Sequence, residues 1–178
     1  MPYGILSPEM KRTIQPLIQG QSVIDLGAGD LSYSRTLKVL GATRVLAVDK
    51  VAMPEVHGID TLCCDFSSPI EVMDVAFVSW PINHFCLGLN EVLDQYDTVI
   101  YLGCNIEGKA CGSLELFHYL TKRNPCVHIF EKRNTLLIYS KAPRVQSLYA
   151  EEIAAFDGWA GGSIMSYQDA LKYNQDFR

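Results

Sequence analysis

Apolar positions along the chain fall into short runs separated by polar, helix-forming segments. Seven of these runs have the length and the Val, Ile, Leu and Phe content of buried strands. They are 22–26, 44–48, 59–64, 75–79, 98–102, 126–131 and 135–141. Helices are expected at 7–19, 32–40, 87–95 and 113–123. Strands that alternate with helices predict a parallel sheet covered on both faces.

Local signals at the two ends of this pattern refine the prediction. Ser7 can cap the first helix, Pro8 suits its first position, and Gly20 ends it. The last two strands flank a short turn at 132–134, which predicts an antiparallel hairpin. We therefore expect an α/β fold, a three-layer Rossmann-like sandwich with a mostly parallel seven-stranded sheet and an antiparallel C-terminal hairpin strand.

The chain contains no internal repeat or Pro/Ser-rich linker, so a single domain is expected over 1–178. Within it, 1–21 would form a helical cover and 22–141 the core. Residues 142–178 would form a C-terminal extension with a helix at 166–173.

The composition indicates a folded chain, and the net charge limits the classes of partner that it could bind. Hydrophobic residues make up 48% and charged residues 20%, as in globular proteins. The net charge of −5 disfavours a dedicated nucleic-acid binder, because phosphate contacts dominate such affinity. Neither a signal peptide nor a membrane-length apolar run is present, so the cytoplasm is expected.

The six cysteines show neither a C-x-x-C pair nor a zinc-like Cys/His spacing, so we expect reduced thiols and no metal site. An alternative is that Cys104 and Cys111, near the expected edge of the active site, bind a soft metal or a metalloid substrate.

The strongest local signal is the segment 23–30, Val-Ile-Asp-Leu-Gly-Ala-Gly-Asp. A buried strand carries Asp25 into a glycine turn that opens a helix, and glycines allow close approach of backbone to a ligand. Ligands of open α/β sheets bind at the carboxyl ends of the strands. A dinucleotide fingerprint would need glycine where Ser32 stands. Asp25 also opposes a pyrophosphate and suits an amine or hydroxyl groups instead.

On these residues, the sequence resembles the class I S-adenosylmethionine methyltransferase family, whose first motif looks like 25–29. The resemblance implies that the turn packs on the methionine part of S-adenosylmethionine. It further implies that Asp49 accepts hydrogen bonds from the ribose and Asp65 from the adenine amine, with apolar neighbours on the ring. The cofactor-binding residues expected are Asp25, Gly27, Ala28, Gly29, Asp49, Lys50, Asp65, Phe66 and Ser79.

Each acid also has a purely structural interpretation. Asp25 could cap the following turn, Asp49 could be a solvated strand-end acid, and Asp65 could cap the segment that follows it.

The segment 79–83, Ser-Trp-Pro-Ile-Asn, lies where the family places its catalytic loop. Family members that methylate amino nitrogens often carry Asp/Asn/Ser-Pro-Pro-Tyr/Phe there. This chain keeps Ser79 and Pro81 but departs at Trp80 and Ile82, so base methylation is not implied. Trp80 either walls the substrate pocket or packs in the core. The catalytic candidates are Ser79, Pro81, Asn83 and His84.

Their expected roles depend on the acceptor. Ser79 and Asn83 would orient an amine, and His84 would act as the base for a hydroxyl or thiol, unless it is an ordinary loop histidine. The expected function is methyl transfer to an N or O acceptor on a small molecule or macromolecule, with S-adenosylhomocysteine as the product. A small molecule or protein is favoured over nucleic acid, and no membrane is expected. The alternatives are a non-catalytic binding or scaffold protein and a nicotinamide-nucleotide-dependent reductase.

Overall fold

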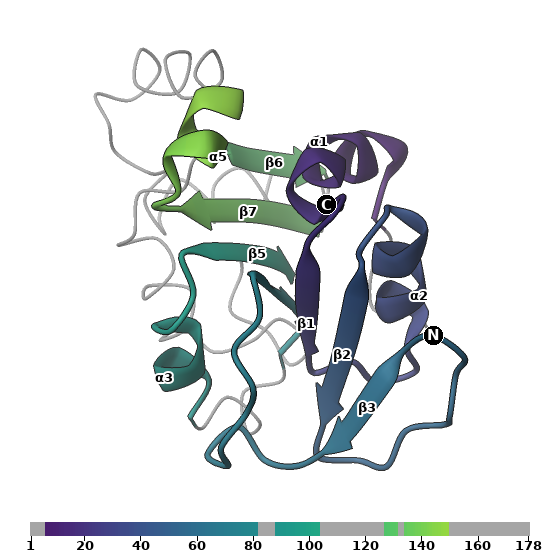
Figure 1. The fold of residues 1–178 in the computed structure, drawn as a ribbon. Helices are drawn as coiled ribbons and strands as arrows, with labels where there is room; N and C mark the ends of the chain where they lie inside the picture. Colours follow the sequence, from purple (N-terminus) through teal and green to yellow (C-terminus); the bar gives the residue numbers. More distant parts are fainter. Residues whose placement is uncertain (1–5, 82–87, 104–126, 132–133, 150–178) are drawn as a thin grey trace, which may run out of the picture.

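The computed structural model describes residues 6–81, 88–103, 127–131 and 134–149, which form one mixed sheet with helices on both faces (Figure 1). The helices are α1 (Pro8–Ile18), α2 (Ser32–Val39), α3 (Leu89–Leu93) and α5 (Pro143–Leu148). The strands are β1 (Ser22–Leu26), β2 (Arg44–Asp49), β3 (Asp60–Cys63), β4 (Val75–Ser79), β5 (Thr98–Gly103), β6 (Val127–Glu131) and β7 (Asn134–Ser140).

The sheet has seven strands in the order β3-β2-β1-β4-β5-β7-β6. Strands β1 to β5 pair in parallel, whereas β7 lies antiparallel between β5 and β6. The predicted α/β class, with a mostly parallel sheet closed by an antiparallel hairpin, is confirmed.

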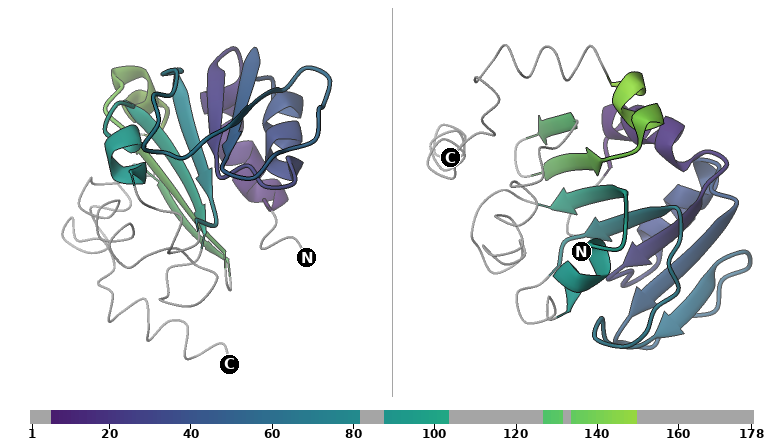
Figure 2. Two further views of the ribbon diagram at one scale, coloured as in Figure 1. Left: turned by 90° about the horizontal axis from the view of Figure 1, so that it is seen from below. Right: turned by 60° about the vertical axis from the view of Figure 1, so that its left-hand side comes forward.

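Both faces of the central strands are buried, which explains why they read as nearly continuous apolar runs. Alternate residues of β1 point to opposite faces. Val23 joins the core beneath α1, α2 and α5, while Ile24 and Leu26 join the core beneath α3. Figure 2 shows α3 on the opposite side of the sheet from α1 and α2.

Two of the predicted helices correspond to α1 and α3 of the structure. The Ser7 hydroxyl accepts a hydrogen bond from the Met10 N–H at 3.1 Å, as the capping prediction requires. The helix expected at 87–95 spans only 89–93 among the described residues. The helices expected at 113–123 and 166–173 lie outside the described residues.

Helix α5 was not expected from the sequence, although Pro143 at its start is a helix signal. Its Val145 side chain and the following Tyr149 are buried in the core beneath α1. The Tyr149 hydroxyl donates a hydrogen bond to the Thr13 carbonyl of α1. The start of the C-terminal extension therefore packs onto the N-terminal helix.

Within the described ranges, no helix is long and apolar enough to cross a membrane.

Candidate functional site

A cavity of about 460 Å³ opens at the carboxyl ends of β1, β2, β3 and β4. From β1, the chain builds the sheet outward on one side through β2 and β3 and then returns to β4 on the other side. The junction of β1 and β4 is thus a topological switch point, where open α/β sheets bind their ligands. The cavity is lined by Leu26, Gly27, Ala28, Gly29, Asp30, Ser32, Tyr33, Asp49, Lys50, Val51, Cys64, Asp65, Phe66, Ser79, Trp80 and Pro81.

The glycine turn forms one wall of this cavity. Gly27 and Gly29 have φ angles of 80° and 53°, which glycine adopts without steric penalty. The N–H groups of Gly27 and Ala28 donate to the Val48 carbonyl at 2.8 and 3.1 Å. The Gly29 N–H donates to Asp49 Oδ2 at 2.9 Å. Because these donors already bond to β2, the turn does not offer them to a phosphate.

The turn continues into Leu31, which also has a positive φ of 64° although it carries a side chain. That conformation costs a non-glycine residue about 1–2 kcal/mol. The Leu31 side chain is fully buried in the core beneath α2, and full burial of a leucine contributes roughly 1.5–3 kcal/mol. Core packing thus offsets the strain, which no local sequence signal indicated.

Asp25 is the predicted cofactor residue that does not line the cavity. Its side chain is fully buried, and its Oδ2 accepts a hydrogen bond from the Ser34 hydroxyl of α2 at 2.5 Å. Its Oδ1 is buried without a hydrogen-bond partner among the described residues. Burial raises the pKa of Asp25 to about 7, although the Ser34 hydrogen bond opposes this rise. Strand alternation points the Asp25 side chain toward α2. Because this side chain is buried and does not line the cavity, the direct contact with a cofactor that the sequence predicted is not made.

Asp49, at the end of β2, lines the cavity. Its Oδ2 accepts from the Gly29 N–H, and its Oδ1 accepts from the Val51 N–H at 3.0 Å. Each carboxylate oxygen can accept more than one hydrogen bond. Asp49 therefore both fixes the glycine turn and presents acceptor capacity to the cavity. Lys50 and Val51 line the same wall.

Asp65 and Phe66, just beyond β3, line the cavity beside them. Asp65 Oδ1 accepts hydrogen bonds from the Ser67 N–H at 3.0 Å and from the Ser67 hydroxyl at 2.9 Å. These two bonds, the backbone one foremost, lower the pKa of Asp65 below its ordinary value. Asp65 is thus an ionised hydrogen-bond acceptor, and the Ser67 hydrogen bonds within the same turn fix its carboxylate. Phe66 is half-buried and packs against the core beneath α3.

The end of β4 forms the remaining wall. Ser79 is buried, and Pro81 lines the cavity beside it. Trp80 has a positive φ of 45°, and its N–H donates to the Leu102 carbonyl of β5 at 2.8 Å. Its half-buried side chain lines the cavity and also packs on the core beneath α2, so it fills both roles that the sequence allowed. Backbone strain of this kind clusters at functional sites.

Two of the catalytic candidates, Asn83 and His84, lie outside the described residues, as do Cys104 and Cys111. In the described part of the chain, His, Cys, Asp and Glu side chains form no cluster that could hold a metal ion.

Several lining residues were not singled out from the sequence. Tyr33, in the first turn of α2, is the clearest; its ring lies 5.7 Å from that of Phe77, and burial raises its pKa to about 12. Its place one turn after the glycine motif was the available signal. The other unpredicted lining residues are Leu26, Asp30, Ser32, Val51 and Cys64.

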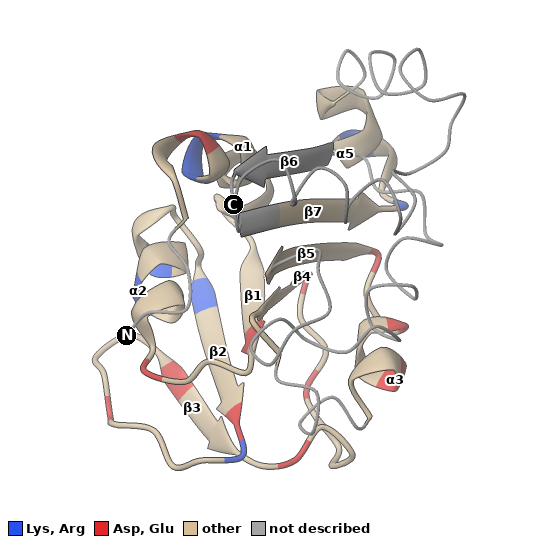
Figure 3. Cartoon of the chain, turned by 180° about the vertical axis from the view of Figure 1, so that it is seen from behind, with Lys and Arg blue, Asp and Glu red and all other residues tan. Residues whose placement is uncertain are grey.

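The cavity is acidic. Asp30, Asp49 and Asp65 line it, whereas Lys50 is the single basic side chain among its described lining residues. Figure 3 shows the acidic position at the end of β2, at this end of the sheet. A ligand with positive charge is therefore favoured over one with several phosphates.

The sheet order and the antiparallel closing hairpin define a Rossmann-like fold, which solved methyltransferases share. The structure is similar to that of the proposed RNA methyltransferase PH1948 from Pyrococcus horikoshii. The TM-score is 0.55 and the identity 18%, over 74% of this chain and 80% of that one.

Two further solved structures share the fold. The ribosomal protein L11 methylase from Lactobacillus delbrueckii subsp. bulgaricus has a TM-score of 0.54 and 15% identity, over 78% of this chain and 80% of that one. The 1,6-didemethyltoxoflavin-N1-methyltransferase from Burkholderia thailandensis was solved with S-adenosylhomocysteine bound. It has a TM-score of 0.53 and 14% identity, over 78% of each chain. At such identities the likeness establishes the fold. Searches against protein-family models and curated sequences give no match.

Proposed function

We propose that this protein is an S-adenosylmethionine-dependent methyltransferase. The observation that carries the proposal is the cavity at the switch point, walled by the glycine turn and by the strand-end acids Asp49 and Asp65. S-adenosylmethionine combines ribose hydroxyls and an adenine amine, which need acceptors, with a positively charged sulfur and amine. The acidic wall fits these groups, and the bonded N–H groups of the turn do not favour a pyrophosphate.

In this proposal, Asp49 accepts hydrogen bonds from the ribose and Asp65 from the adenine amine. Phe66, next to Asp65 in the wall, packs on the adenine ring, and Lys50 adjoins the ribose. The Gly27–Gly29 turn lies against the methionine part. Asp25 makes no direct contact with the ligand in this proposal, because it is buried and bonded to the Ser34 hydroxyl.

When bound, S-adenosylmethionine supplies a methyl group on a positively charged sulfur, which a nucleophile can attack in line. The chain's task is then to orient the acceptor and exclude water. We assign acceptor orientation to Ser79, Pro81 and Asn83. His84 would take the proton when the acceptor is a hydroxyl.

The acceptor is proposed to be an N or O atom of a small molecule or a protein. The acidic chain disfavours free nucleic acid. The solved neighbours are named for different substrates, including RNA, a ribosomal protein and a toxoflavin precursor, so their names do not choose among acceptors.

Calorimetric titration with S-adenosylhomocysteine tests the proposal. The wild-type protein should bind it, and Asp49→Ala should weaken binding by about 1–3 kcal/mol, because ligand hydroxyls enclosed in the cavity would lose an acceptor. Asp60→Ala is the matched control: it also removes one carboxylate, but from the exposed start of β3, outside the cavity lining. No binding by the wild type would overturn the proposal, and equal affinity of Asp49→Ala and wild type would remove Asp49 from it.

A second candidate, binding without turnover, is favoured by one observation. Trp80 stands where amino-methylating relatives often carry proline, and its strained backbone places a large ring in the cavity wall. Binding of S-adenosylhomocysteine without methyl transfer to any of a panel of amines, phenols and proteins would support this candidate over the enzyme.

A further inference from the structure

Gly88 lies immediately before α3, far from the glycine turn in sequence, yet its backbone abuts the cavity wall. It has a φ of 79°, in the left-handed region. A Cβ atom at this position would lie 3.0 Å from the Ser67 backbone N, 3.1 Å from the Phe66 carbonyl C and 3.2 Å from the Phe66 carbonyl O. These atoms all belong to backbone, which cannot swing aside as a flexible side chain can. A side chain at position 88 would therefore require the Phe66–Ser67 backbone to shift by a few tenths of an ångström.

The atoms that Gly88 abuts belong to the turn that carries two cavity residues. The Ser67 N–H is the donor that bonds Asp65 Oδ1 at 3.0 Å. The same turn is closed by the Ser68 N–H, which donates to the Asp65 carbonyl at 3.0 Å. Phe66, whose carbonyl is the other contact, lines the cavity. A shift of the Ser67 backbone would therefore move the donor that orients the Asp65 carboxylate.

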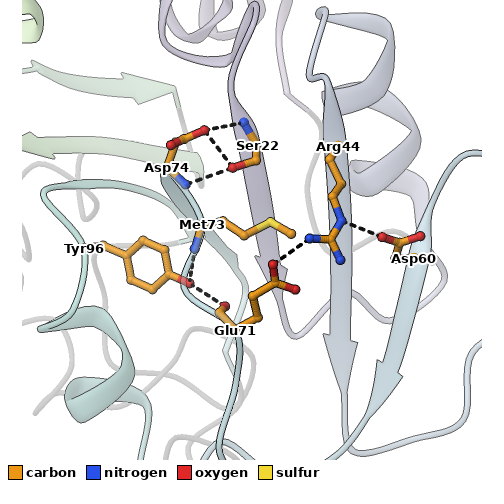
Figure 4. A network of polar contacts seen from close by, with 7 residues as sticks. All are labelled: Ser22, Arg44, Asp60, Glu71, Met73, Asp74 and Tyr96. Carbon is orange, nitrogen blue, oxygen red and sulfur yellow. Dashed lines mark hydrogen bonds and ion pairs between the residues drawn. The ribbon is translucent and has the colours of Figure 1, made fainter.

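The remainder of this segment is anchored at its two ends. At the near end, the Cys64 N–H donates to the Asp49 carbonyl at 3.0 Å. At the far end, Glu71 pairs with Arg44 of β2 at 2.7 Å, and Asp74 Oδ2 accepts from the Ser22 N–H at 2.8 Å (Figure 4). The Gly88 contact falls between these anchors. This contact can therefore set the position of the Asp65–Ser68 turn relative to α3.

We propose that Gly88 is a positioning residue for the cofactor site: the absence of its side chain lets the start of α3 seat the Asp65–Ser68 turn so that Asp65 and Phe66 face the cavity. The assignment of these two residues to the adenosine end of the ligand rests on the proposed function. The seating itself is a property of the free protein.

Gly88→Ala tests this proposal, with Gly20→Ala as the matched control. Gly20 has nearly the same φ, 77°, but a Cβ there would meet no atom within 4 Å. Both variants carry the strain of a positive φ, and Gly88→Ala alone adds the clash with the turn. We expect Gly88→Ala to weaken S-adenosylhomocysteine binding about tenfold and Gly20→Ala to change it less than about twofold. Gly88→Asn retains the clash with a residue that tolerates this backbone, so it replaces Gly88→Ala should the alanine variant fail to fold.

Two readouts separate positioning from a general loss of stability. In the free protein, NMR titration should show the Asp65 pKa rising toward its ordinary value in Gly88→Ala but not in Gly20→Ala, because only the former disturbs the Ser67 hydrogen bonds. In binding, Asp65→Ala should lower affinity less in the Gly88→Ala background than in the wild type.

The outcomes distinguish this proposal from the proposed function. An unchanged Asp65 titration in Gly88→Ala, or additive losses in the double variant, would overturn the role of Gly88 even when the wild type binds the ligand. A wild type that binds no S-adenosylhomocysteine, with a shifted Asp65 titration in Gly88→Ala, would overturn the proposed function and leave the seating of the turn supported.

Discussion

At the scale of single residues, Asp25 is the most informative side chain. It is an acid enclosed between β1 and α2, with one hydrogen-bond donor, the Ser34 hydroxyl, and one buried oxygen without a partner among the described residues. Burial disfavours the charged form, so the carboxyl retains its proton up to about pH 7 in the folded protein. Its protonation therefore couples to folding in the neutral range.

The direction of this coupling follows from the two pKa values. The unfolded chain loses the proton near 3.8 and the folded protein near 7, so the folded state binds more protons between these values. The free energy of unfolding should therefore fall as the pH rises from about 4 to about 7, by up to roughly 4 kcal/mol. Asp25→Asn should remove this decline, since asparagine does not ionise. Urea denaturation at pH 5, 6.5 and 8 measures it.

Asp74 supplies an internal contrast. Hydrogen bonds from Ser22 lower the pKa of Asp74. Its contribution to the free energy of unfolding is therefore present at neutral pH and is lost as the pH falls through the folded pKa. Asp74→Asn should thus leave the decline between pH 5 and 8 intact. An identical decline in Asp25→Asn and wild type would show that Asp25 ionises at its ordinary pKa.

At the scale of elements, the packing of α5 on α1 joins the end of the described sheet to the start of the chain. Tyr149 is 5% exposed, and its hydroxyl bonds the Thr13 carbonyl. The contact joins residues 136 positions apart, so forming it carries the entropic cost of closing a long loop. It closes the core beneath α1 on the side of the hairpin.

Tyr149→Phe should lower the free energy of unfolding by about 0.5–1.5 kcal/mol, because one intramolecular hydrogen bond is lost while the ring remains buried. Leu148→Ala, at a 47% exposed position of the same helix, should change it by less than about 0.5 kcal/mol. Chemical denaturation of the three proteins makes the comparison. An equal effect of the two substitutions would mean that the Tyr149 hydrogen bond contributes nothing specific.

At the scale of the whole molecule, the strand order decides where a ligand can bind and the charge decides which one. The switch between β1 and β4 opens the sheet edge, and three carboxylates lie around it: Asp30 of the glycine turn, Asp49 at the end of β2 and Asp65 just beyond β3. The N–H groups of the glycine turn are already bonded to β2. The same sheet edge that binds pyrophosphates in dinucleotide enzymes is here unfavourable to them.

A thermal-shift panel tests this selectivity. If the proposed function is correct, S-adenosylmethionine and S-adenosylhomocysteine should raise the melting temperature, because a ligand that binds only the folded state stabilises it. NAD⁺ and NADP⁺ at equal concentration should give little or no rise, since their phosphates meet the acidic wall. A larger rise with either dinucleotide would favour the reductase that the sequence left as an alternative.

Local sequence specified much of the architecture and part of the site. The strand at 75–79 has the predicted bounds because a strand buried on both faces must be apolar throughout. Asp49 and Asp65 reached the same cavity because parallel strands bring their carboxyl ends to one edge. The glycine turn was recognisable because its positive φ angles demand that residue type.

Folding in three dimensions specified the rest. Asp25 could have faced either side, because both faces of β1 are buried and the apolar pattern does not distinguish them. Leu31 adopts a left-handed conformation while its side chain is buried in the core. A side chain at Gly88 would crowd the Phe66–Ser67 backbone, which is distant in sequence. Strand periodicity and turn chemistry act between neighbours in sequence, whereas side-chain facing, strain and close backbone contact arise only when distant segments meet.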